Sequence, residues 1–116
     1  MNWNILAPIG LLAGSNVVMN LAWYGHLKFP HKALWVAVLA AWGLAFFEYC
    51  LAVPANRIGA KAYSLAELKT MTEVMSLLGF LLVAWLLFDQ RPGVSQLVGF
   101  ALIAAGAFFV FKAPLG

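Results

Sequence analysis

Charged side chains are scarce in this sequence. Only 7 of the 116 residues are Lys or Arg and 4 are Asp or Glu, together 9% of the chain, whereas a soluble domain carries about 25%. A soluble domain of this length needs a polar surface around one small core, and so few charges cannot provide it. The shortage excludes an ordinary soluble domain and favours a protein whose solvent is the bilayer.

The sequence also has few of the residues on which metal and catalytic sites depend. The single cysteine, Cys50, excludes an intrachain disulfide. The histidines, His26 and His31, fall in a predicted loop without a partner at metal-ligand spacing. We find no nucleophile–base motif and no phosphate loop. We therefore expect no enzymatic activity, no cofactor and no metal, and the net charge of +3 does not indicate a nucleic-acid partner.

Long apolar runs are what the sequence does contain. A helix needs about 20 mostly apolar residues to span a bilayer, and four segments qualify: 5–25, 33–55, 65–88 and 94–112. The connections are short, so consecutive helices should be antiparallel neighbours. We expect an all-α membrane protein, a single four-helix transmembrane domain over residues 1–116. The first run is too long, and its start too poor in positive charge, for a cleaved signal peptide.

One helix start is marked by a motif. Ser64 and Glu67 have the spacing of a capping box. In this motif the serine side-chain oxygen accepts a hydrogen bond from the glutamate backbone N–H, and the glutamate side chain accepts one from the serine backbone N–H. The motif predicts that the third helix begins at Leu65 and that Glu67 is a cap.

The basic residues of the connections are evenly divided between the two sides of the membrane. Topology follows the Lys and Arg bias of short loops, and here the count is three against three. One side has Arg57, Lys61 and Lys112, and the other has Lys28, Lys32 and Arg91. Two alternatives are open: insertion in both orientations, from which antiparallel dimers can follow, or one orientation set by features that the count misses.

Small residues predict helix packing in two segments. Gly10 and Gly14 form a small-xxx-small pair in the first helix, and Gly99 and Gly106 lie seven apart in the fourth. Such residues let helix backbones approach closely in membranes. We expect these faces to pack within the chain or between subunits.

The first helix also has a polar stripe. Asn16 and Asn20 are four residues apart, and Tyr24 extends the stripe to the membrane interface. Two alternatives are open: the asparagines hydrogen-bond to neighbouring helices, or they line a polar cavity and belong to a substrate site. Trp42, in the middle of the second helix, is a packing residue or a substrate contact.

The second helix has a carboxylate at membrane depth. Glu48 lies on a face of alanines, and a charged side chain at a helix centre costs about 2.5–3.5 kcal/mol on insertion scales. Such residues are usually functional or paired. Pro54 removes the backbone donor for the Cys50 carbonyl, so we expect a kink just beyond Glu48.

A second carboxylate, Glu73, is predicted at similar depth. Glu48 lies eight residues before Asn56, and Glu73 eight after Leu65, which places both roughly 12 Å from the same membrane face. Two carboxylates in one chamber would form a proton-binding site. The alternative is structural: Glu73 pairs with Lys69, four residues earlier, and Glu48 hydrogen-bonds to a neighbour.

Three strings in the sequence carry a family resemblance. They are AWYGHLK at 22–28, FFEYCLAVPANRIG at 46–59 and LKTMTEV at 68–74. With these strings the chain resembles a small four-helix family of unknown function in the drug/metabolite transporter superfamily. The resemblance implies a multi-pass protein of the bacterial inner membrane and a role in transport.

The chain is more distantly similar to the small multidrug resistance exporters. The shared elements are Leu51-Ala-x-Pro54 and the Gly-x-x-Leu-Ile-x-x-Gly string from Gly99 to Gly106. Those exporters are antiparallel homodimers that exchange protons for cations at a first-helix glutamate. An ungapped alignment puts Gly14 at that position, so proton exchange here would need Glu48 or Glu73.

Three functions are compatible with these patterns. The first is a homodimeric transporter that exchanges protons for a small or amphipathic solute at the buried glutamates. The second is an accessory subunit that packs into a larger membrane complex. The third is a lipid-carrier flippase, in which Arg57 or Lys61 would bind phosphate.

Overall fold

The computed structural model describes residues 3–112, and over that range the chain forms four α-helices and one short 3-10 helix. These are α1 (Trp3–Tyr24), η1 (Gly25–Lys28), α2 (Leu34–Gly59), α3 (Leu65–Phe88) and α4 (Val94–Lys112). All four α-helices are long and apolar enough to cross a membrane. The chain is therefore an all-α, multi-pass membrane protein, as its composition predicted; the ends of the expected domain, 1–2 and 113–116, lie outside the described residues.

Two helix boundaries differ from the sequence prediction by two residues or more, and two others by one residue. α1 begins at Trp3 rather than at residue 5, and α2 continues beyond residue 55, through Pro54, to Gly59. A proline inside a helix removes one hydrogen bond, while the remaining turns keep theirs. The connection expected to start at Asn56 is thus shorter, whereas the kink at Pro54 stays a prediction.

The start of α3 confirms the predicted capping box. The Glu67 backbone N–H donates to Ser64 Oγ at 3.1 Å, and the Ser64 N–H donates to Glu67 Oε1 at 2.8 Å. At the other end, Asp89 adopts a left-handed conformation (φ 52°) and the Gln90 N–H donates to the Ala84 carbonyl at 3.0 Å. Both ends of α3 are therefore closed by local hydrogen bonds.

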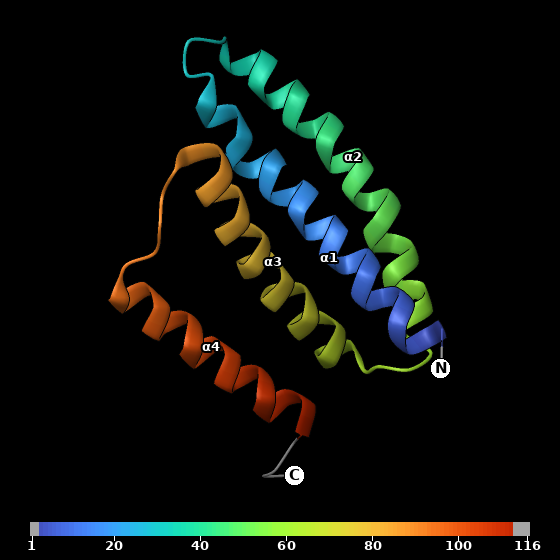
Figure 1. Ribbon diagram of the computed structural model, residues 1–116. Coiled ribbons are helices and arrows are strands. Elements are labelled where there is room, and N and C mark those ends of the chain that lie inside the picture. The colour runs from blue at the N-terminus through green and yellow to red at the C-terminus, as the bar shows by residue number, and fades with distance from the viewer. Residues whose placement is uncertain (1–2, 113–116) are drawn as a thin grey trace.

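The helices do not lie in the order of the sequence. α1 packs against both α2 and α3, and α4 packs against α3 (Figure 1). α2 and α3 are connected by a short segment but do not pack along their lengths, because α1 lies between them. The expectation that every pair of consecutive helices would be neighbours was wrong for this pair. α4 has no buried residue in its described range.

The contact between α1 and α3 depends on a glycine. A Cβ at Gly79 would lie 3.0 Å from Asn20 Nδ2 and 3.3 Å from the Asn16 carbonyl oxygen. Asn20 Nδ2 donates to the Asn16 carbonyl at 2.8 Å and to the Ser76 carbonyl of α3 at 3.0 Å. The bare backbone at Gly79 lets the two helices approach closely enough for Asn20 to join them.

Helices α1, α2 and α3 also meet at the end where α2 passes into α3. Gly59 faces Leu68 and Pro8 so closely that a Cβ there would lie 2.7 Å from Leu68 Cδ2 and 3.2 Å from Pro8 Cγ. The Tyr63 hydroxyl donates to the Ile5 carbonyl at 2.9 Å. This end of the helix bundle is therefore held by close packing and by a side-chain bond between distant segments.

Candidate functional site

Glu48 is the one glutamate of the described chain that is buried. Its side chain faces α1, and the residue is 8% exposed. Ser15 of α1, itself 1% exposed, donates its hydroxyl to Glu48 Oε1 at 2.8 Å. Small alanines on the same face of α2 let α1 come close enough for this bond. The carboxyl group is therefore held at the α1–α2 contact by a neighbouring helix.

The second oxygen of Glu48 has no such partner. Oε2 is buried and accepts no hydrogen bond from any group in residues 3–112. A buried carboxylate is costly unless its charge and its acceptor sites are satisfied. A bound proton, or a donor group on a solute, would lower that cost. The geometry thus leaves Glu48 with one fixed oxygen and one oxygen able to bind.

A cavity approaches Glu48 from one membrane face. It has a volume of about 520 Å³ and lies between α1, η1, the segment that follows η1 and α2, with Leu87 of α3 also lining it. His26 and Lys28 line it near the membrane surface, and Leu44 lines it within the bilayer. Leu44 precedes Glu48 by one helical turn on the same face of α2. The cavity therefore extends to within a turn of the carboxyl group.

Glu73 has a different environment. Its side chain is 59% exposed and pairs with Lys69 Nζ at 2.9 Å, one turn back on α3. The chamber expected to hold both carboxylates does not form within one chain, because α1 separates α2 from α3. The contacts of the structural alternative are present at both residues, an ion pair at Glu73 and a hydrogen bond at Glu48, and a functional role of either residue stays a prediction. Residue counting predicted the depth of Glu73 but not the direction in which it points.

The polar stripe of α1 is partly used for packing. Asn16 Nδ2 donates to the Leu12 carbonyl at 2.8 Å, and Asn20 bridges α1 and α3. Asn20 and Tyr24 also line a hollow of about 240 Å³. Asn20 thus bonds to a neighbouring helix and borders this hollow, while Asn16 is engaged with its own helix, and a substrate role for either stays a prediction.

The remaining predicted site residues are mostly on open surfaces. Trp42 is 71% exposed on α2. A Cβ at Gly14 would lie 3.7 Å from Leu51 Cδ1, so this glycine faces α2. Nothing lies within 4 Å of the Cβ position at three other glycines, Gly10, Gly99 and Gly106. The packing expected at those three does not occur within the described part of a single chain.

Ser15 is the site residue that sequence reasoning missed. It is 33 residues from Glu48 along the chain, so nothing local joins the two. The available signal was a small polar residue in an apolar span, of the kind that often forms interhelical bonds. A search of residues 3–112 for groups of three His, Cys, Asp or Glu that could hold a metal ion finds none.

Comparison with known proteins gives one match. A family model described as "Putative member of DMT superfamily (DUF486)" matches residues 8–111. The matched range includes Ser15, Glu48 and the cavity residues between them, and reaches into α4. No curated protein and no solved structure matches the chain at the threshold applied.

Proposed function

The chain belongs to the DUF486 family of the drug/metabolite transporter (DMT) superfamily, and we propose that it exchanges protons for a small or amphipathic solute at Glu48. The observation that carries this proposal is the environment of the carboxyl group. Ser15 holds Oε1 at 2.8 Å, whereas Oε2 is buried without a partner. Glu73 and Lys69, which pair with each other, are left out of the proton site. The proposed function is transport, without an enzymatic reaction on the solute.

The exchange follows from competition for one oxygen. A proton on Glu48 neutralises the buried charge, and a cationic solute that donates to Oε2 compensates it. The two cannot occupy the same oxygen together, so binding of the solute displaces the proton. If the site opens alternately to each side of the membrane, this competition couples the two fluxes. Ser15 acts as a positioning residue that keeps the carboxyl group turned toward α1.

The cavity beside Leu44 gives the solute a route toward Glu48. A volume of about 520 Å³ lies within the range of 300–1,000 Å³ typical of small-molecule sites. Its walls of alanine and leucine suit an apolar body, and His26 and Lys28 mark its mouth. The route to Oε2 then needs a rearrangement of Leu44, one turn away.

We propose further that the transporter is a homodimer, with antiparallel subunits, in the bacterial plasma membrane. α4 is open, with Gly99 and Gly106 uncovered. A second copy would cover this surface, and the even division of loop charges permits both orientations.

Proton release on solute binding tests the proposed exchange. The purified protein, in weakly buffered detergent solution, is mixed with a panel of amphipathic amines and neutral amphiphiles while the pH is recorded. A solute that binds at Glu48 should release up to about one proton per chain. Glu48→Gln should release none, and Glu73→Gln, the matched control, should behave as the unmodified protein does. Equal release from both variants would remove Glu48 from the mechanism.

An accessory subunit of a larger membrane complex is the second candidate. The open surfaces of α2 and α4, including Trp42 and Gly106, favour it. Purification in mild detergent separates the two candidates, because an accessory subunit should carry a stoichiometric partner, whereas a transporter should run as a dimer of this chain. A lipid-carrier flippase has less support, since Arg57 and Lys61 line neither the cavity near Leu44 nor the hollow beside Asn20.

A further inference from the structure

The other side of α1 borders a group of hollows that the proton site does not use. Tyr24 follows Ser15 by nine residues, which places the two on opposite faces of the helix. The largest hollow, about 560 Å³, lies between α3, the α3–α4 connection and α4. Two smaller ones, of about 240 and 180 Å³, lie where α1 meets α3. Phe80 lines all three, so we call them together the Phe80 cavity.

The lining residues show that the three hollows adjoin. Phe100 lines the first and second, Gln90 the first and third, and Tyr24 the second and third. The rings of Tyr24 and Phe80 meet edge to face with centroids 5.6 Å apart. The three hollows therefore adjoin around one aromatic ring, and the largest of them alone is within the size range of a small-molecule site.

Two of the polar groups of this cavity lie at the membrane surface, whereas Asn20 and Ser76, which also line it, lie deeper and are joined by the bond from Asn20 Nδ2 to the Ser76 carbonyl. Phe80 lies eight residues inside the end of α3, whereas Gln90 follows that end and Gln96 is in the first turn of α4. Aromatic faces therefore line the membrane interior, and two amides stand at the membrane surface. Each amide has both donor and acceptor atoms, although Gln96 Oε1 already accepts from the Gly93 N–H at 2.9 Å.

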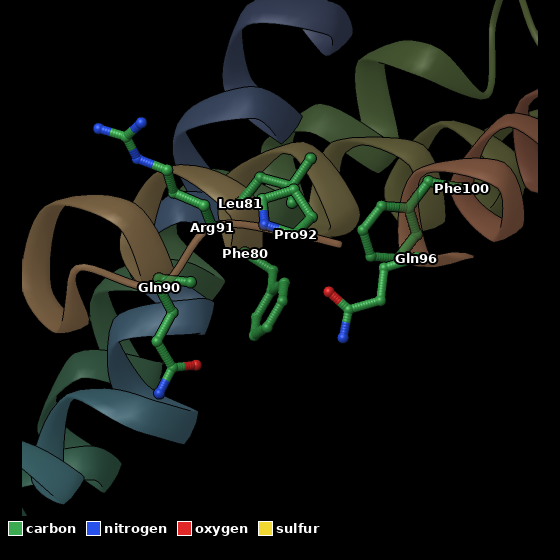
Figure 2. Close-up of a pocket in the computed structure, with 8 residues that line it drawn as sticks. Phe80, Leu81, Gln90, Arg91, Pro92, Gln96 and Phe100 are labelled. Atoms are coloured by element: carbon green, nitrogen blue, oxygen red, sulfur yellow. The ribbon is translucent and has the colours of Figure 1, made fainter. Parts of the chain in front are cut away.

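The charges of the cavity favour a neutral ligand. Arg91 is the one basic residue among its lining residues, and no acidic residue lines it. Figure 2 shows the guanidinium of Arg91 extending away from the side on which Phe80, Gln90 and Gln96 lie. A charged group brought into this cavity would lose water without gaining a counter-ion.

We propose that the Phe80 cavity binds an uncharged amphipathic molecule, with its aromatic or apolar body against Phe80 and Phe100 and its hydrogen-bonding end at Gln90. Entry is from the membrane surface beside Gln90 and Gln96, because the proposed second copy would cover the open face of α4. This site goes beyond the proposed proton exchange. The Phe80 cavity shares no lining residue with the cavity near Leu44 that approaches Glu48. Helix α1 separates the Phe80 cavity from Glu48.

Photolabelling with three related probes tests the site. 4-(Hydroxymethyl)benzophenone has an aromatic body and an uncharged polar end, and two further benzophenones replace the hydroxymethyl group by an ammonium or a carboxylate. The purified chain in detergent, at one pH and without a proton gradient, is irradiated with each probe. The neutral probe should label the segment from Phe80 to Phe100 saturably, and the charged probes should label it about tenfold less at equal concentration.

Two variants and a matched control locate the labelling. Phe80→Leu should weaken saturable labelling about tenfold through loss of the aromatic contact. Gln90→Ala, outside the helices, should weaken it by a smaller factor and keeps the test valid if Phe80→Leu fails to fold. Phe46→Leu, at a residue 60% exposed on α2, should leave it unchanged.

Three results would overturn the proposal. They are labelling spread over the outer helix faces without saturation, equal labelling by the charged probes, and equal weakening by Phe46→Leu. None of these depends on Glu48, because no proton movement is measured. Failure of the Phe80 site and failure of proton exchange are therefore separate outcomes.

Discussion

Two glutamates of the spanning helices, Glu48 and Glu73, lie at similar predicted depth in contrasting surroundings. Glu48 is 8% exposed, with one oxygen held by Ser15 and the other without a partner. The side chain of Glu73 is 59% exposed and forms an ion pair with Lys69 on its own helix. Glu48 therefore interacts with a neighbouring helix, whereas Glu73 interacts with a residue of its own helix.

This contrast shows what a carboxylate needs in order to act as a proton site within one chain. Depth is common to both residues, so depth is not what separates them. The difference comes from the face of the helix that carries each residue: the face of α2 with Glu48 packs against α1, whereas Glu73 is on an open face of α3. A local ion pair satisfies Glu73, while burial leaves Glu48 with an acceptor oxygen that no described group satisfies.

Charge reversal should give the largest difference between the two glutamates in the free energy of unfolding. Glu48→Lys would place an ammonium in the α1–α2 contact without a counter-ion, and we expect it to lower the free energy of unfolding by about 3–5 kcal/mol. Glu73→Lys adds only a like-charge contact with the exposed Lys69, at a cost of about 0.5 kcal/mol. Thermal unfolding in detergent, followed by helical circular dichroism, measures both. Similar losses would mean that the two sites are equally buried in the assembled protein.

Neutralisation should separate the two residues by function rather than by stability. In vesicles that contain a pH-sensitive dye, Glu48→Gln should reduce solute-driven proton movement by about 100-fold or more, because an amide cannot take up and release a proton. Glu73→Gln should stay within about twofold of the unmodified protein, since an exposed local pair contributes little. A larger loss in Glu73→Gln would show that Glu73 belongs to the proton path, for instance across a subunit interface.

Removal of the hydroxyl at Ser15 should have a smaller effect. Ser15→Ala leaves both oxygens of Glu48 without a donor, and an interhelical bond of this kind is worth about 1 kcal/mol in a membrane protein. The loss should largely disappear when Glu48 is changed to Leu as well, because no buried carboxyl then needs a donor. The four unfolding midpoints of this double-mutant cycle test the coupling. Additive losses would argue against a functional bond between the two side chains.

The ion pair on α3 should contribute least. Lys69→Ala removes the partner of Glu73, and we expect a change of less than about 0.5 kcal/mol, because both side chains are more than half exposed. The measurement is the same unfolding midpoint, repeated at low and high salt. A loss comparable to that of Ser15→Ala would indicate that a second copy or a partner buries this pair.

Part of the structure could be predicted because it depends on neighbouring residues alone. The bounds of α3 and α4 agree with the prediction, and the cap of Ser64 and Glu67 forms as expected. Bilayer thickness sets the length of an apolar span, and a cap involves residues three apart. The prediction ended α2 at residue 55, where the apolar run stops, whereas the helix continues to Gly59 because its backbone bonds do not depend on apolar side chains.

The candidate site was predictable only in part. Glu48 stood out because a carboxylate is rare at membrane depth, and Asn20 because polar residues there usually find a partner. Ser15 gave no comparable signal, although it supplies the hydrogen bond to Glu48. The Phe80 cavity was equally hidden, since Tyr24, Gln90 and Phe100 come from three separate segments.

The sequence by itself determined the four membrane spans, the family and the depth of each carboxylate. The tertiary structure alone decided that α1 lies between α2 and α3, that Glu48 faces Ser15, and that Glu73 points outward. The physical reason is that hydropathy and residue counting describe position along a helix axis. The rotation of each helix, and the choice of its neighbour, depend on contacts such as Gly79 with Asn20 between residues far apart in the chain.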